Sequence, residues 1–220
     1  MRNEVKIMAL VLVIVIIGAV VGAQYYRGTQ NAPKPTTTNS SMIREDSPSI
    51  GPADAKVTVV EFLDPECESC AAFAPRLKSV LKDYEGRARL VVRFVPLHPN
   101  SARAITLIEA AGEQGKFWQA MDLLLQKQSE WGEKHGAPPD APKPDIPALF
   151  EKYAKELGLD IEKYLAAAKE NKFAAKIERE RKDAQSVGVR QTPTIFVNGR
   201  KLNSLSESEL RSMIEDESKK

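Results

Sequence analysis

The clearest hydrophobic pattern in the chain predicts a strand, a helix and a second strand. Residues 57–63 form an almost unbroken apolar, β-branched run, which is typical of a strand buried on both faces. In residues 71–84 apolar side chains recur at helical spacing, so one helix face is expected to pack on a sheet, with a kink at Pro75. Residues 89–95 form the next strand. This order predicts a right-handed parallel βαβ unit.

The chain between residues 101 and 187 shows mainly helical periodicity. Apolar positions recur at helical spacing in residues 102–111, 116–127, 148–157, 161–169 and 173–187. The proline-rich stretch 131–147 is expected to be a loop. Lys and Glu crowd residues 169–183, which predicts a solvated helix face. We therefore expect a helical subdomain, at about residues 101–187, inserted into the βαβ fold.

The C-terminal part predicts a hairpin and a last helix. Residues 194–197 and 200–202 flank Asn198-Gly199, a strong signal for a two-residue type I′ turn. Residues 206–209 have the sequence of a capping box, which opens a helix. With the βαβ unit, this ββα unit indicates an α/β fold.

The N-terminal part differs in composition from the rest. Residues 7–23 are apolar and uncharged, a length at the short end of the range that spans a membrane. We expect residues 1–27 to be a transmembrane anchor; the alternative is a signal peptide cleaved after Val21-Gly22-Ala23. Residues 28–46, rich in Thr, Ser, Asn and Pro, are expected to be a flexible linker. Either alternative exports the domain predicted at residues 47–217.

Cys67 and Cys70 are the two cysteines of the chain, and they lie at the predicted strand-to-helix turn. Two thiols at this spacing can close a small disulfide, and a helix N-terminus favours a thiolate at the first of them. Zinc is the first alternative, but His98 and His135 are too far apart to complete a usual four-ligand site. An inert pair is the second. We therefore expect redox chemistry and neither a metal ion nor a cofactor.

Charge and compartment narrow the possibilities further. The net charge of +2 gives no reason to expect nucleic-acid binding. Export places the domain in a compartment that permits disulfides. A structural disulfide framework usually has more cysteines at wider spacing, so one close pair favours catalysis.

Glu61 interrupts the apolar run of the first predicted strand. A buried carboxyl group is costly unless it has a partner or a task. Six residues before Cys67, it can point beneath the thiols. The alternative is a glutamate at a strand end that reaches solvent.

Several features together resemble the thioredoxin superfamily, and within it the DsbA-type branch of exported thiol–disulfide oxidoreductases. They are the strand entry at residues 51–62 with its acid at Glu61, the Cys67–Cys70 pair, Pro75, the segment 109–118 and the Thr192-Pro193 pair before the hairpin. The resemblance covers residues 50–215 and implies a thioredoxin fold with an inserted helical subdomain.

The resemblance also implies how the site residues act. Cys67 would be the nucleophile, Cys70 the resolving thiol, and Glu61 a proton carrier to the buried thiol. Pro193, a candidate for the cis form, would shape the substrate groove, and Thr192 would bind the substrate backbone. The expected partners are exported protein thiols or disulfides, a membrane thiol oxidase or reductase for recycling, and the membrane through the N-terminal helix.

The sequence does not decide the direction of disulfide exchange. The dipeptide between the cysteines is Glu-Ser where DsbA-type oxidants often carry Pro-His, Gln191 stands where Gly is common, and residues 138–147 resemble an insertion. Asp64, Glu66 and Glu68 place negative charge near Cys67, which opposes a thiolate, whereas the helix terminus favours one. We expect a disulfide donor; the alternatives are an exported reductant or isomerase, and a tethered binding domain without catalysis.

Overall fold

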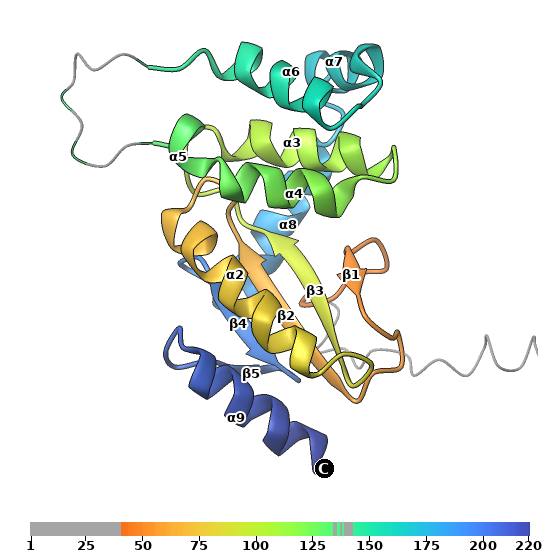
Figure 1. Ribbon diagram of the computed structural model, residues 1–220, viewed down its shortest axis with the longest axis vertical. Coiled ribbons are helices and arrows are strands. Elements are labelled where there is room, and N and C mark those ends of the chain that lie inside the picture. The colour runs from red at the N-terminus through yellow and green to blue at the C-terminus, as the bar shows by residue number, and fades with distance from the viewer. Residues whose placement is uncertain (1–40, 134–135, 137, 139–142) are drawn as a thin grey trace, which may run out of the picture. The chain divides into compact units, whose positions relative to one another are not determined.

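A computed structural model describes residues 41–133, 136, 138 and 143–220 of the chain. Its centre is a five-stranded sheet in the order β1-β3-β2-β4-β5 (Figure 1). The strands are β1 (Ser49–Ile50), β2 (Val57–Leu63), β3 (Ala88–Phe94), β4 (Thr194–Val197) and β5 (Arg200–Lys201). β2 and β3 are parallel, and every other pair is antiparallel. The predicted α/β architecture is confirmed.

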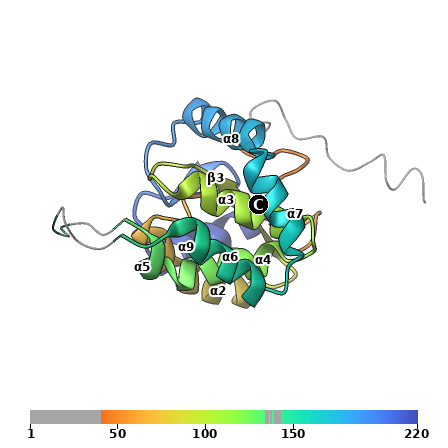
Figure 2. The same cartoon turned by 90° about the horizontal axis from the view of Figure 1, so that it is seen from above.

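The helix α2 (Glu68–Asp83) connects the two parallel strands and continues through Pro75. The remaining helices are α3 (Ser101–Gly112), α4 (Phe117–Gln126), α5 (Gln128–Trp131), α6 (Ile146–Glu156), α7 (Ile161–Lys169), α8 (Ala174–Ser186) and α9 (Glu207–Ser218). Helices α3 to α7 gather beyond one end of the sheet, and α8 lies across the sheet from α2 (Figures 1 and 2). The predicted helical insertion is therefore present.

The alternation of side chains along the strands divides the core in two. On β2, Val59 and Leu63 belong to the larger cluster, which also contains side chains of α2, α3, α4 and α9. Val60 and Phe62 face the other way, into a smaller cluster with Ala184 of α8. Successive residues of a strand point to opposite faces, so the position of Glu61 between Val60 and Phe62 assigns it to the α2 face. Burial of each large apolar side chain contributes about 1.5–3 kcal/mol.

The β4–β5 hairpin forms as predicted. Val197 pairs with Arg200, which leaves Asn198 and Gly199 as the two turn residues. Their φ angles are 46° and 83°, as the type I′ turn requires at both central positions. Ser206 caps α9 by accepting a hydrogen bond from the Glu209 N–H. The Glu209 side chain turns back to the Asn203 and Ser204 N–H groups.

Two boundaries differ from the prediction for residues 131–147. Trp131 ends α5, and α6 begins at Ile146, so Pro147 lies inside a helix. Asp145 caps α6 by accepting a hydrogen bond from the Ala148 N–H at 3.1 Å. Proline is tolerated in the first turn because its missing N–H would have no partner there.

The folded domain starts before residue 47, the predicted boundary. Met42 and Ile43 pack against the smaller core cluster, and Arg44 pairs with Asp183. The C-terminal part of the expected linker is therefore part of the domain. The predicted anchor or signal peptide at residues 7–23 lies outside the described residues. Within the described ranges, no helix is long and apolar enough to cross a membrane.

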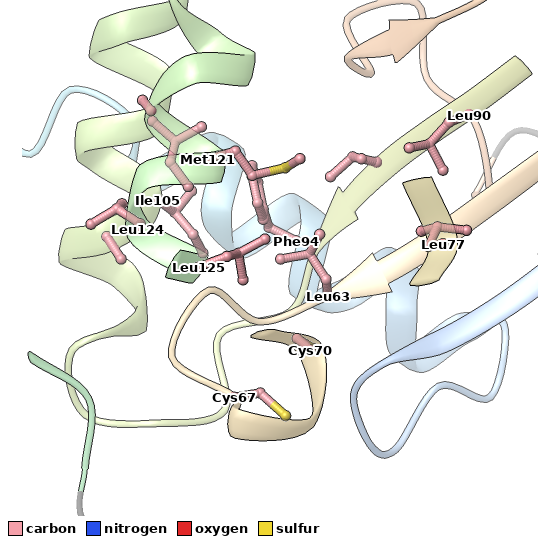
Figure 3. Close-up of a cluster of buried hydrophobic side chains, with 14 of the residues drawn as sticks. Leu63, Cys67, Cys70, Leu77, Leu90, Phe94, Ile105, Met121, Leu124 and Leu125 are labelled. Atoms are coloured by element: carbon pink, nitrogen blue, oxygen red, sulfur yellow. The ribbon is translucent and has the colours of Figure 1, made fainter. Parts of the chain in front are cut away.

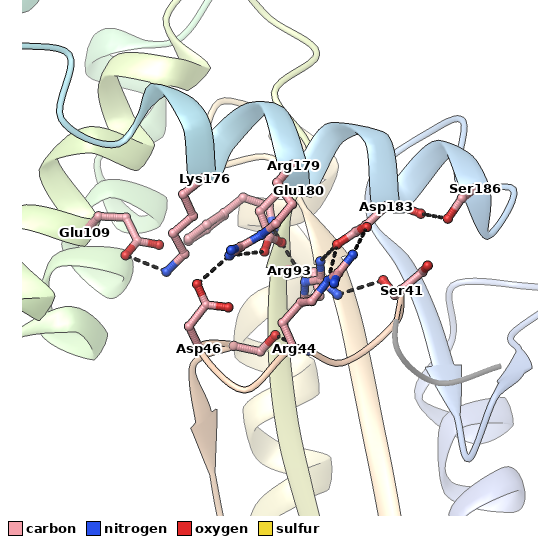
Figure 4. A network of polar contacts seen from close by, with 12 residues as sticks. Ser41, Arg44, Asp46, Arg93, Glu109, Lys176, Arg179, Glu180, Asp183 and Ser186 are labelled. Atoms are coloured by element: carbon pink, nitrogen blue, oxygen red, sulfur yellow. Dashed lines mark hydrogen bonds and ion pairs between the residues drawn. The ribbon is translucent and has the colours of Figure 1, made fainter. Parts of the chain in front are cut away.

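A buried ion-pair network covers the α8 face of the sheet (Figure 4). The side chain of Arg93 on β3 is fully buried and donates to Glu180 at 2.6 Å and to Asp183 at 2.7 Å. Arg44 donates to both carboxyl oxygens of Asp183. The prediction of a solvated helix face at residues 169–183 is therefore wrong for Glu180 and Asp183, because their partner comes from a distant strand.

We predict that Asp183→Asn lowers the free energy of unfolding by about 3 kcal/mol, since it leaves the buried charge of Arg93 with fewer partners. Burial opposes the charged form of Asp183, but its bonds to Arg44 and Arg93 lower its pKa. The stabilisation is therefore present at neutral pH and is lost as the pH falls through that lowered pKa. Urea denaturation measures the change.

Lys182→Gln is the matched control on the same helix. Lys182 is 70% exposed and pairs with Glu178 at the surface, so the loss should be below about 1 kcal/mol. Equal effects of the two substitutions would contradict the importance of the buried network.

Candidate active site

The two cysteines lie at the start of α2, in the turn that leaves β2. Cys67 is the N-cap residue, and its N–H donates to the Asp64 carbonyl oxygen at 3.0 Å. Both thiols are free. Cys67 is 8% exposed and Cys70 is 1% exposed, so Cys67 is the more accessible thiol but less exposed than expected. The Cys67 sulfur points away from the apolar cluster behind the turn (Figure 3).

The local environment stabilises a thiolate at Cys67. Its pKa is lowered to about 5, and the largest cause is a hydrogen bond that the Cys70 thiol donates to the Cys67 sulfur. Burial acts in the opposite direction, but the Thr192 side chain and the N–H groups of Cys70 and Ser69 also stabilise the charge. These N–H groups belong to the first turn of α2, where the backbone has no intrahelical partner.

Cys70 has the opposite tendency. Burial raises its pKa, and its hydrogen bond to Cys67 and the nearby charges of Glu61 and Cys67 raise it further. Reduction of a Cys67–Cys70 disulfide would therefore give one thiolate, at Cys67, and one protonated thiol, at Cys70.

Glu61 is buried on the α2 face of the central strand. It is 3% exposed, and its register neighbours are Val92 on one side and Ile195 on the other. Among the described residues its carboxyl group has no hydrogen-bond or ion-pair partner, and burial raises its pKa to about 8. The alternative of a glutamate that reaches solvent is therefore wrong. The charge of Glu61 acts on Cys70, which indicates that the two groups lie near each other.

The Thr192–Pro193 segment lies against Cys67. When it is protonated, the Cys67 thiol donates to the Thr192 carbonyl oxygen at 3.3 Å, across 125 positions of sequence. The peptide bond between Thr192 and Pro193 is cis. Pro193 is buried and Thr192 is partly exposed at the entrance to β4. The structure thus brings together four of the five predicted site residues directly, with Glu61 beneath them.

Asp64 and Glu66 do not act as the sequence suggested. Asp64 is fully buried, and its carboxyl oxygens accept hydrogen bonds from the Leu97 and Glu66 N–H groups, at 2.7 and 2.9 Å. Glu66 is 2% exposed and accepts from the Asn100 N–H at 2.6 Å. Both carboxyl groups are surrounded by donors, and the pKa of Cys67 is lowered despite them. The donors around Cys67 therefore outweigh the negative charge expected to oppose a thiolate.

His98 is a neighbour of the site. From the sequence we had mentioned it only as a possible zinc ligand. Its Nδ1 lies 2.7 Å from Asp64 Oδ2. A usable signal was present, since His98 follows β3 just as Asp64 follows β2, and parallel strands end at the same edge of a sheet. Across the described ranges, no group of three or more His, Cys, Asp or Glu side chains could hold a metal ion.

Residues 44–216 match a family model described as thioredoxin. The chain belongs to the thioredoxin family. It is similar to the curated Na⁺/H⁺ antiporter NhaA 3 of Salinispora tropica, with 37% identity over 154 residues, which is 69% of this chain and 21% of that protein. The chain thus spans about a fifth of the length of this relative.

Solved thioredoxin-like structures share the fold over most of their length. BdbD from Bacillus subtilis is 27% identical, with 79% of this chain and 94% of that chain covered and a TM-score of 0.69. A thioredoxin-like oxidoreductase from Silicibacter pomeroyi is 25% identical, with 82% and 98% covered and a TM-score of 0.65. The alpha-DsbA1 protein of Wolbachia pipientis, at 16% identity, 84% and 96% coverage and a TM-score of 0.69, shows the fold. The DsbA-like thioredoxin fold with a helical insertion is confirmed.

We predict that the reduced protein shows one thiolate that titrates near pH 5, measured by ultraviolet absorbance. Cys70→Ala should raise this midpoint, because it removes the thiol that donates to the Cys67 sulfur. Cys67→Ser should abolish the transition. A midpoint near 8.5, the ordinary value for cysteine, would contradict the proposed thiolate stabilisation.

Proposed function

We propose that this protein is an exported thiol–disulfide oxidoreductase that donates the Cys67–Cys70 disulfide to extracytoplasmic proteins. The observation that carries the proposal is the contrast between the two thiols, with the pKa of Cys67 lowered to about 5 and that of Cys70 raised. A stabilised thiolate lowers the free energy of the reduced pair relative to its disulfide. The disulfide is then readily reduced by substrate thiols, which is the property of a donor.

The exchange takes two steps. A substrate thiolate attacks Cys67 Sγ, a substrate–Cys67 bond forms, and the Cys67–Cys70 bond breaks with the electron pair on Cys70. Cys70 takes a proton. A second substrate thiolate then attacks the substrate sulfur, and Cys67 leaves as a thiolate. The substrate loses two electrons and becomes a disulfide, and the protein gains them as one thiolate and one thiol.

Glu61 is suited to supply the proton to Cys70. With a pKa raised to about 8, its carboxyl group is largely protonated at neutral pH. It has no other polar partner among the described residues, so a proton on it is available to Cys70, directly or through water. In the reverse direction the carboxylate would accept this proton.

Thr192 and Pro193 are suited to bind the substrate chain beside Cys67. The Thr192 carbonyl is 3.3 Å from Cys67 Sγ, so a peptide that pairs with this backbone would place its own sulfur near the reacting atom. Pairing through main-chain groups suits a donor with many substrates, because it does not depend on the substrate's side chains.

The remaining parts of the proposal concern location and recycling. The apolar run at residues 7–23 supports a membrane anchor with the catalytic domain on the extracytoplasmic side. After each donation the reduced pair holds two electrons, so a thiol oxidase in the same membrane would have to accept them. The runner-up, an exported reductant or isomerase, fits less well because the thiolate is already stabilised.

We predict that the oxidised full chain converts a reduced peptide with two cysteines to its disulfide in one stoichiometric turnover, followed by mass spectrometry. The reverse reaction identifies the sulfur that bonds to the substrate: given the disulfide form of the peptide, reduced Cys70→Ser should accumulate the mixed disulfide between the peptide and Cys67, because Cys70 is no longer present to attack that bond. Cys67→Ser should accumulate far less, since Cys70 is 1% exposed.

Equal trapping by the two variants would contradict the assignment of Cys67 as the attacked sulfur. No transfer from the oxidised wild-type chain would reject the donor function. Reduction of a disulfide peptide by the reduced chain, without transfer in the other direction, would favour the reductant.

We predict that Glu61→Gln slows disulfide exchange and stabilises the fold at pH 8 by up to about 5 kcal/mol. Folded Glu61 keeps its proton up to about pH 8, whereas unfolded Glu loses it near pH 4.3. Stability therefore falls as the pH rises between these values, and glutamine removes this loss.

Urea denaturation at pH 4 and pH 8 and the pH dependence of the exchange rate measure the two effects. Glu85→Gln is the control, because Glu85 is exposed and follows the end of α2 that is far from the cysteines. An unchanged rate profile with the expected stabilisation would make Glu61 a structural residue without a proton-transfer role.

A further inference from the structure

The ends of the two parallel strands bring His98 into the redox site. The Val95 N–H donates to the Leu63 carbonyl oxygen at 2.8 Å, so the pairing of β2 with β3 continues to the last residue of β2. Cys67 is the fourth residue after Leu63, and His98 is the third residue after Val95. The two residues therefore belong to adjacent loops at the same edge of the sheet.

Asp64 connects these loops directly. Its carbonyl oxygen accepts a hydrogen bond from the Cys67 N–H at 3.0 Å, and its Oδ2 atom lies 2.7 Å from His98 Nδ1. Oδ2 also accepts from the Ser101 hydroxyl at 2.8 Å. Because Asp64 is fully buried and held by several donors, its side chain has little freedom. It fixes the position of the His98 ring relative to the turn that carries Cys67.

We propose that the Asp64–His98 pair supplies positive charge to the redox site, so that the protonated ring of His98 stabilises the Cys67 thiolate and couples the redox state of the cysteines to pH. The inference rests on the reactivity of Cys67 that the proposed function assumes, but it does not depend on the direction of exchange. Asp64 acts through His98 and is a positioning residue.

The charges around His98 support this assignment. Among the described residues, the charged groups with the largest effect on it are Asp64, Cys67 and Glu66. Burial alone would lower the pKa of His98, but the hydrogen bond and charge of Asp64 raise it, and the charges of Cys67 and Glu66 add to this. The net effect is a raised pKa. A carboxylate at Asp64 accepts the Nδ1 proton and so favours the protonated ring.

Coupling between two titrating groups is reciprocal. If the Cys67 thiolate raises the pKa of His98, a protonated His98 lowers the pKa of Cys67 by the same amount. In the disulfide form Cys67 carries no charge, so this part of the His98 shift should disappear. The Glu68-Ser69 dipeptide between the cysteines offers no cation, and His98 provides one from another loop.

The decisive experiment is an NMR titration of the histidine rings of the wild-type full chain in the oxidised and reduced forms. The chain has two histidines, so His135→Gln assigns the signals. We expect the pKa of His98 to be higher in the reduced form by about half a unit or more, as for a nearby partly exposed opposite charge. In reduced Cys67→Ser the value should fall to that of the oxidised protein. An identical His98 pKa in both redox forms would overturn the proposal.

A second measurement tests the reciprocal effect. His98→Gln keeps a donor for Asp64 but cannot carry a positive charge. We expect the thiolate midpoint of Cys67 to rise by the same amount as the His98 pKa difference, and the pH profile of exchange to lose its inflection near the His98 pKa. His135→Gln should change neither.

The outcomes separate this inference from the proposed function. An unchanged thiolate midpoint in folded His98→Gln would overturn the role of His98 even if the protein donates disulfides. Coupled titrations of His98 and Cys67 in a protein that donates none would support the Asp64–His98 pair and reject only the donor function.

Discussion

The parallel pairing of β2 with β3 is the constraint on which the site depends. It ends both strands at one edge, where the turn that carries Cys67 and the loop that carries His98 are joined through Asp64. The same pairing places Glu61 beside Val92, and the antiparallel pairing of β2 with β4 places it beside Ile195 on its other side. A shift of one residue would turn Glu61 towards α8 and Phe62 towards α2, because side chains alternate between faces. The register is therefore as important to the chemistry as the cysteines.

Buried ionisable groups on the two faces of this sheet are stabilised in different ways, by ion pairing on the α8 face and by protonation on the α2 face. On the α8 face Arg93 keeps its charge, because Glu180 and Asp183 lie within 2.7 Å. On the α2 face Glu61 has no such partner among the described residues. Burial raises its pKa to about 8, so its carboxyl group is largely protonated and uncharged at neutral pH. The desolvation of an isolated ion costs several kcal/mol, which exceeds the cost of holding a proton at neutral pH. The unpaired group is therefore the one suited to the proposed proton transfer.

The sequence was sufficient for the features that depend on local patterns. Apolar periodicity predicted β2, α2 and β3, and Asn198-Gly199 predicted the hairpin, because each signal lies within one element or turn. The two-residue strand β1 was missed, since its pairing with β3 gives no periodic pattern of its own. The burial of Asp183 was also missed, because Arg93 lies 90 positions away in the chain. A charged helix face has the same sequence pattern whether its partners are water molecules or a buried arginine.

The candidate site shows why counting charges along the sequence could not decide whether Cys67 is a thiolate. Asp64, Glu66 and Glu68 are all near Cys67 in sequence, yet only Glu68 is exposed without a role in the local hydrogen bonds of the described residues. The other two carboxyl groups orient backbone N–H groups and the His98 ring towards themselves, so each negative charge is accompanied by positive ends of dipoles. The thiolate responds to the nearest donors, which are the Cys70 thiol and the first N–H groups of α2. In this fold the acids near the cysteines build the frame that holds the donors, and the sign of the local potential follows from hydrogen-bond geometry more than from the number of charges.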